Sequence, residues 1–221
     1  AATPRLRGKA GELVEGGLVR PMVRQRHLPH ADHLVDEQKI PLDAAGEGLH
    51  RHAADDHLVG TAITDGSSDV LLFSSGGKAV RFKESAVRAM GRTAHGVRGM
   101  RLGAGQRVVS LIVPDDSASQ VLTLSANGYG KRTATGDFPL HGRAGQGVIA
   151  MQASERNGAL VGAIRVLPSD EMMLISDQGT LLRTAVEQIS LLSRNTQGVK
   201  VMNMRDGETL VGMARIAESG E

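Results

Sequence analysis

The stretch Leu71–Phe82 reads LLFSSGGKAVRF, and it returns twice, as LTLSANGYGKRT over Leu122–Thr133 and as MLISDQGTLLRT over Met173–Thr184. Each copy has a short apolar run, a turn that contains glycine and a second short run with a basic residue. This order is typical of a β-hairpin whose turn glycine adopts a positive φ. The sequence therefore predicts three equivalent hairpins.

Further columns of residues keep the same period. The turn glycines and three other sets each recur at intervals of 51 residues: Gly77, Gly128 and Gly179; Arg81, Arg132 and Arg183; Arg92, Arg143 and Arg194; Gly96, Gly147 and Gly198. Each unit closes on a short apolar run, VVSLIV from Val108, LVGAIRV from Leu160 and LVGMARI from Leu210. About four short strands in each period is the spacing of propeller blades.

We therefore predict an all-β fold, a β-pinwheel or propeller-like repeat that forms a partial disc of about three blades. The blades are expected over residues 69–118, 119–169 and 170–219. A β-sandwich is the alternative, but it would not need a fixed period. The stretches KESAVRAM from Lys83 and AVEQIS from Ala185 fit short helical turns between strands.

The first quarter of the chain lacks this pattern. Leu58–Thr64 (LVGTAIT) matches a closing strand, whereas residues 1–57 have lost the register and hold six of the eight histidines. We interpret residues 1–57 as an irregular segment, arising either from a shifted reading frame or from a degenerate blade. His27, His30 and His33 are spaced like metal ligands on a helix, but Pro29 interrupts them, and we predict no metal site.

Composition excludes several classes of protein. The 221 residues contain no Cys, which excludes disulfide scaffolds, thiol nucleophiles and zinc sites with cysteine ligands. No apolar run is long enough to span a membrane, and a cytoplasmic location is expected. The acids are scattered and no catalytic constellation occurs, so we predict no active site within the chain. Tyr129, the single tyrosine, is interpreted as a packing residue at a hairpin turn.

The charge distribution favours a polyanionic partner. Between Val70 and Pro114 there are eight basic residues against Glu84 alone, whereas the third unit is net acidic. A curved basic strip could follow a nucleic-acid backbone from phosphate to phosphate, with glycine-rich loops allowing close approach. The alternatives are a solvated outer face and, for the loop glycines, simple tight turns; Arg81, between Val80 and Phe82, is expected to face water. The candidate DNA-binding residues are Lys78, Arg81, Lys83, Arg88, Arg92, Arg98, Arg101, Lys131, Arg132, Arg143 and Arg194.

Several segments resemble the C-terminal domain of bacterial DNA gyrase A. They are LVGTAITDGSSDVLLFSSGGKAVRFKESAVRAMGRTAHGVRGMRL from Leu58, ANGYGKRT from Ala126, GRAGQGVIAMQ from Gly142, SERNG from Ser154 and RNTQGVKV from Arg194. The resemblance covers residues 58–221. It implies a β-pinwheel, six-bladed in the family, whose basic rim wraps double-stranded DNA so that the whole enzyme can introduce negative supercoils.

The resemblance also implies partners and limits. The partners would be DNA, the rest of gyrase A and its companion gyrase B, with the fragment itself monomeric. ATP and Mg²⁺ would belong to other parts of the enzyme, so no cofactor is expected in this chain. The family's catalytic tyrosine lies in a domain that is missing here, and its Q-R-R-G-G-K-G box has no counterpart. The related domain of DNA topoisomerase IV and a propeller-like protein-interaction scaffold remain alternative functions.

Overall fold

The computed structural model describes residues 57–90, 96–114 and 119–216, which form strands and short 3₁₀ turns without an α-helix among them. The 3₁₀ turns, Glu84–Ala86, Thr135–Asp137 and Val186–Gln188, follow the second strand of each hairpin. The first and third confirm the helical turns expected near Lys83 and Ala185, and the second was not predicted. The strands are β1 (Asp69–Ser74), β2 (Lys78–Lys83), β3 (Val108–Ile112), β4 (Gln120–Ser125), β5 (Tyr129–Ala134), β6 (Val148–Ile149), β7 (Leu160–Val166), β8 (Glu171–Ser176), β9 (Leu181–Ala185), β10 (Val199–Lys200) and β11 (Leu210–Ile216).

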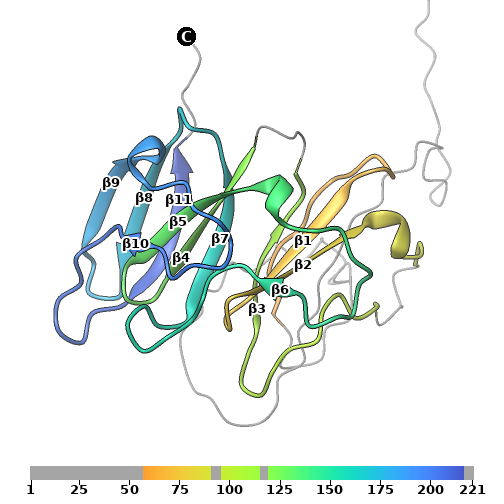
Figure 1. Ribbon diagram of the computed structural model, residues 1–221, viewed down its shortest axis with the longest axis horizontal. Helices are drawn as coiled ribbons and strands as arrows, with labels where there is room; N and C mark the ends of the chain where they lie inside the picture. The colour runs from red at the N-terminus through yellow and green to blue at the C-terminus, as the bar shows by residue number, and fades with distance from the viewer. Residues whose placement is uncertain (1–56, 91–95, 115–118, 217–221) are drawn as a thin grey trace, which may run out of the picture.

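The strands form three antiparallel sheets that lie beside one another in chain order (Figure 1). The first sheet has the order β3-β1-β2-β6, the second β10-β5-β4-β7 and the third β11-β8-β9. The all-β, propeller-like prediction is therefore confirmed. The turn glycines Gly77, Gly128 and Gly179 have φ of 74°, 76° and 81°, as the sequence predicts.

The fourth strand of each complete sheet comes from the following unit. Strand β6, from the second unit, pairs with β2 of the first, and β10, from the third unit, pairs with β5 of the second. In the described part of the chain no strand pairs with the outer edge of β9. Adjacent units are thus joined by exchanged strands, which the sequence pattern did not predict.

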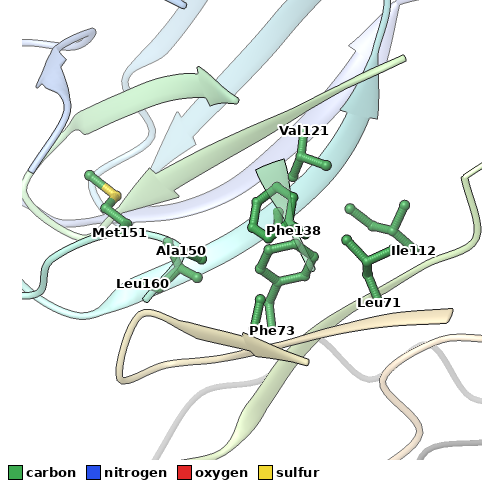
Figure 2. Packing of buried hydrophobic residues seen from close by; sticks show 10 residues of the cluster. Leu71, Phe73, Ile112, Val121, Phe138, Ala150, Met151 and Leu160 are labelled. Carbon is green, nitrogen blue, oxygen red and sulfur yellow. The ribbon is translucent and has the colours of Figure 1, made fainter. Parts of the chain in front are cut away.

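The hydrophobic core lies mainly in the seams between units. One cluster joins Leu71 and Phe73 of the first unit to Val121, Phe138 and other residues of the second (Figure 2). The rings of Phe73 and Phe138 meet edge to face with their centroids 5.6 Å apart, a favourable aromatic geometry. A second cluster packs the second unit against the third in the same way. Because β1 lies between layers, all six of its residues are buried.

Upstream of β1, residues 57–64 are described and form no regular strand. This stretch lies beside the first sheet: Val59 packs against the cluster around Leu72, and Gly60 lies close to Leu111. The predictions made for residues 1–56, including the histidine cluster, and for Arg92 fall outside the described residues. A search of the described residues finds no helix with the length and hydropathy to span a membrane.

Candidate nucleic-acid interface

Two of the candidate arginines join neighbouring units. Arg81 lies on β2 and donates through Nη1 to the carbonyls of Thr135 and Phe138 in the next unit, at 3.0 and 3.1 Å. It also pairs with Asp69 at 2.6 Å and is only 21% exposed. Arg81 therefore does not simply face water, as the strand alternation had suggested, because the next unit covers that face of β2.

Arg132 repeats this arrangement one unit later. Its guanidinium donates to the carbonyls of Ile189 and Glu187 in the third unit and to the side chain of Gln120 in its own sheet. The main chain of Arg132 also bonds to the third unit, since its N–H donates to Ser190 and its carbonyl accepts from Leu192. Arg81 and Arg132, which are one period apart, thus each connect their own unit to the one that follows.

Arg143 and Arg194 make the reverse connection, back to the preceding unit. Arg143 donates to the carbonyls of Ala86 and Arg98 in the first unit. Arg194 donates to the carbonyl of Ile149, which is the residue that corresponds to Arg98 one period later. Both side chains are half-buried in their seams. A side chain bound to main-chain carbonyls positions the exchanged strand, whatever else it contacts.

Lys131 is the largest departure from a surface cation. The side chain is fully buried and its Nζ donates to the carbonyls of Ser193, at 2.7 Å, and Arg194 in the third unit. Burial, together with the charge of Arg194, lowers the pKa of Lys131 to about 8. Its ammonium lies inside the second seam, away from the surface that a nucleic acid could reach.

The remaining candidates that the structure describes lie at least partly on the surface. Lys83 pairs with Asp69 at 2.7 Å, and Lys78 lies 3.4 Å from the side-chain oxygen of Gln146. Burial opposes ionisation of Asp69, but the hydrogen bonds from Lys83 and Arg81 hold the pKa of that carboxyl below its ordinary value. A single carboxylate, Asp69, thus pairs with two of the basic side chains of the first unit, Arg81 and Lys83.

Three candidates are exposed and have guanidinium groups without a partner among the described residues. Within the described part of the chain, the side chains of Arg88, Arg98 and Arg101 are exposed and make no hydrogen bond or ion pair. The first unit thus presents cations that no carboxylate neutralises. In the third unit, by contrast, Arg183 pairs with Glu171 and Arg215 with Asp170.

The structure also brings together two cations that the charge pattern of the sequence did not single out. The guanidinium carbon of Arg156 lies 4.8 Å from the centroid of the Tyr129 ring, and Nζ of Lys200 lies 5.7 Å from it. Tyr129 does pack against the first seam cluster, in keeping with its interpretation as a packing residue. No sequence signal linked these three residues, because Lys200 reaches Tyr129 only through strand exchange. The described residues contain no cluster of three or more potential metal ligands.

Fold and site together define a class: a repeat protein of propeller-like blades that exchange an edge strand and carry basic residues on their exposed side. A family model described as "DNA gyrase C-terminal domain, beta-propeller" matches residues 68–115, 119–166 and 170–217. The chain belongs to this family.

Individual relatives agree with the family. The chain is 56% identical over 163 residues to DNA gyrase A of Pseudomonas aeruginosa, covering 74% of this chain and 18% of the relative. It is 50% identical over 177 residues to DNA gyrase A of Escherichia coli, covering 80% of this chain and 20% of the relative. The chain thus spans about a fifth of the length of these relatives.

Solved structures show the same architecture. A DNA gyrase A C-terminal domain matches with a TM-score of 0.70 and 26% identity, over 78% of this chain and 59% of that one. A C-terminal domain of DNA topoisomerase IV matches with a TM-score of 0.70 at 24% identity, over 75% of this chain and 52% of that one, which shows the shared fold alone.

Proposed function

We propose that this chain binds and bends double-stranded DNA as a module of DNA gyrase A, and so supports ATP-dependent negative supercoiling by the whole enzyme. The observation that carries the proposal is the set of exposed arginines without carboxylate partners on the first unit, Arg88, Arg98 and Arg101. Membership of the gyrase C-terminal family supports it.

The proposed mechanism is electrostatic. Each arginine that contacts a DNA phosphate releases counterions condensed on the duplex, which makes binding favourable and strongly dependent on salt. Phosphates carry no base identity, so sequence preference should be slight. The blades, over residues 69–118, 119–169 and 170–219, would hold these cations along a curved path, with Lys78, Lys83 and Arg92 adding to it.

In this proposal the chain is a non-catalytic, monomeric part of a cytoplasmic enzyme. DNA cleavage and ATP hydrolysis, with their Mg²⁺, would belong to the rest of gyrase A and to gyrase B. Its role would be to present a bent DNA segment to those parts. The corresponding domain of topoisomerase IV is a second candidate, since its fold is the same. The high identity to gyrase A proteins favours gyrase.

Salt-dependent binding of a short duplex tests the proposal. The slope of log affinity against log salt should reveal several phosphate contacts, at about 0.9 for each. Changing Arg88, Arg98 and Arg101 together to Gln should reduce that slope by roughly 2–3. A protein-interaction scaffold with an incidental basic face would instead bind DNA weakly, with a slope near zero.

A matched control removes the same number of charges elsewhere. Changing Arg183, Arg205 and Arg215 to Gln alters the third unit, where two of the three arginines already pair with carboxylates. The control should retain most of the wild-type slope. Equal losses in the two triple variants would show that the first unit is not the principal contact.

A further inference from the structure

At the second seam, two cations from different units approach one aromatic ring. Tyr129 begins β5, and strand exchange places Lys200 of β10 directly opposite it. Arg156, from the loop before β7, lies over the ring at 4.8 Å, and the Lys200 ammonium lies 5.7 Å from its centroid. Both distances fall within the range of cation–π attraction.

The loop that carries Arg156 is fixed at both ends. The side-chain nitrogen of Asn127, in the hairpin turn, donates to the carbonyls of Glu155 and Arg156, each at 3.1 Å. Asn157 is fully buried and donates to the carbonyls of Gln152 and, across the seam, Gln197. The backbone of Arg156 is therefore held beside Tyr129 before any ligand arrives.

The two cations are not neutralised. Arg156 and Lys200 are both exposed, and among the described residues neither makes an ion pair. The nearest acid along the chain is Glu155, whose carbonyl rather than its carboxylate is engaged. The hydrogen bond from Arg156, aided by the charges of Arg156 and Lys200, lowers the pKa of Tyr129, which reflects the positive potential at this point.

The same place on the first seam also carries a cation. Lys78 is 51 residues before Tyr129, begins β2 as Tyr129 begins β5, and pairs with β6 as Tyr129 pairs with β10. Its ammonium lies near Gln146 at the seam surface. Lys78 thus places a positive charge near the corresponding part of the first seam, although the residues equivalent to Lys200 and Arg156 there are Ile149 and Gly105.

We propose that Arg156 and Lys200, both oriented by contact with the Tyr129 ring, form a clamp for one phosphate of duplex DNA at the second seam. The inference rests on the proposed DNA-binding function and extends its contact path from the first unit to the second. Tyr129 is a positioning residue here. The clamp exists only when β10 of the third unit is paired with β5, so it couples DNA binding to the assembly of neighbouring units.

The test compares salt-dependent duplex binding by the full chain and its variants. Changing both Arg156 and Lys200 to Gln should weaken binding on the order of tenfold and reduce the salt slope by about 0.9, because one phosphate contact is lost. The double variant Arg183→Gln/Arg205→Gln, which removes the same charge, should bind as the wild type does. Thermal unfolding midpoints of all variants check that each is folded.

Tyrosine variants separate positioning from direct contact. Tyr129→Phe keeps the ring and should bind within about twofold of the wild type, whereas Tyr129→Leu should weaken binding about two- to fivefold. Equal losses from the two would overturn the positioning role. If the wild type binds duplex with a steep salt slope and the Arg156/Lys200 variant does the same, the clamp is wrong and the proposed function stands. If the wild type itself does not bind duplex at 50 mM salt, the proposed function fails.

Discussion

Two turn glycines with the same backbone conformation should respond very differently to alanine. Gly128 (φ 76°) and Gly179 (φ 81°) occupy equivalent hairpin turns. A Cβ on Gly128 would lie well under 3.0 Å from the carbonyl oxygen of Met202, which belongs to the third unit, whereas a Cβ on Gly179 meets nothing within 4 Å. Gly179→Ala thus isolates the conformational cost, and Gly128→Ala adds the cost of displacing the exchanged segment.

The expected difference in unfolding free energy between the two variants follows from the hydrogen bonds that each substitution would break. An L residue in the left-handed region costs roughly 1–2 kcal/mol, partly offset by a less flexible unfolded chain, so Gly179→Ala should lower the free energy of unfolding by about 1 kcal/mol. The carbonyl of Gly128 accepts hydrogen bonds from Val201 and Met202, at 2.9 and 3.0 Å. Losing these two bonds at about 1 kcal/mol each brings the expected cost of Gly128→Ala to roughly 3 kcal/mol.

Urea unfolding of the two variants, monitored by far-UV circular dichroism, measures these free energies. The variant Gly77→Ala provides a replicate, because its Cβ would meet the carbonyl oxygen of Met151 in the same way. Gly77→Ala and Gly128→Ala should therefore resemble each other and differ from Gly179→Ala. If all three variants lost the same stability, the exchanged strands would not depend on these turns, and the reasoning would fail.

Three further experiments test other parts of the structure. The pKa of Lys131 in the folded chain, about 8, is below its ordinary value of 10.5, so between pH 8 and 10.5 the unfolded chain binds this proton more strongly and stability should rise with pH. Urea titrations should show a gain in unfolding free energy on the order of 1–3 kcal/mol relative to Lys131→Met over this range. Identical pH profiles for the wild type and this variant would contradict the assignment. Glu84 is buried, and both its carboxylate oxygens lack a hydrogen-bond partner among the described residues; the equivalent residues one and two periods later are Thr135 and Val186. Glu84→Val should therefore increase the free energy of unfolding by about 1–3 kcal/mol and raise the thermal midpoint. A lower midpoint would show that the carboxylate is stabilising. Bending DNA by 40–90° costs about 1–6 kcal/mol, and the arginines of the third unit that pair with carboxylates offset little of this cost. Ligation of a nicked circle in the presence of the chain should therefore leave the linking number almost unchanged. A large topoisomer shift would show that three units suffice for wrapping.

The fold could be predicted because its determinants are local and repeated. The turn glycines, the apolar runs around them and the 51-residue period define each hairpin within a dozen residues of sequence. The origin of the fourth strand could not be predicted in this way. Val148–Ile149 and Val199–Lys200 are strands of only two residues, too short for their sequence to distinguish their own sheet from the preceding one. Only the packing of neighbouring units decides between these sheets.

The candidate site could be predicted only in part. Counting charges identified the first unit as strongly basic, and Arg88, Arg98 and Arg101 are indeed exposed there. Counting could not distinguish them from Arg81, because a side chain that alternates outward on an isolated hairpin becomes half-buried once the next unit covers it. Sequence reasoning also passed over Arg156 and Lys200, which are 44 positions apart and meet at Tyr129 only across a seam.

The division between structural and free cations follows the repeat for most of these residues. Arginines that recur in phase, such as Arg81 with Arg132 and Arg143 with Arg194, bind main-chain carbonyls across seams. A seam of the same geometry has to be formed after each unit, so the residues that form it are repeated. Three of the free cations break the repeat: one and two periods from each stand other residue types, Pro139 and Ser190 for Arg88, Gln152 and Asn203 for Arg101, and Gly105 and Gly207 for Arg156. Arg98 and Lys200 differ from these, because they stand two periods apart with Ile149 between them.

This asymmetry has a physical reason. A DNA backbone that passed over successive units would not need the same contact at each unit, whereas strand exchange has to be the same at every seam. Lys131 is an exception to this division. One period before and after it stand Val80 and Leu182, yet the Lys131 side chain is buried in a seam with its ammonium bound to two carbonyls. The exception is consistent with its lowered pKa, because a buried ammonium at a position that is otherwise apolar is costly to keep charged. In this chain, therefore, an arginine shared by successive units indicates a bond between units, and an exposed cation without a partner among the described residues is the better candidate for contact with DNA.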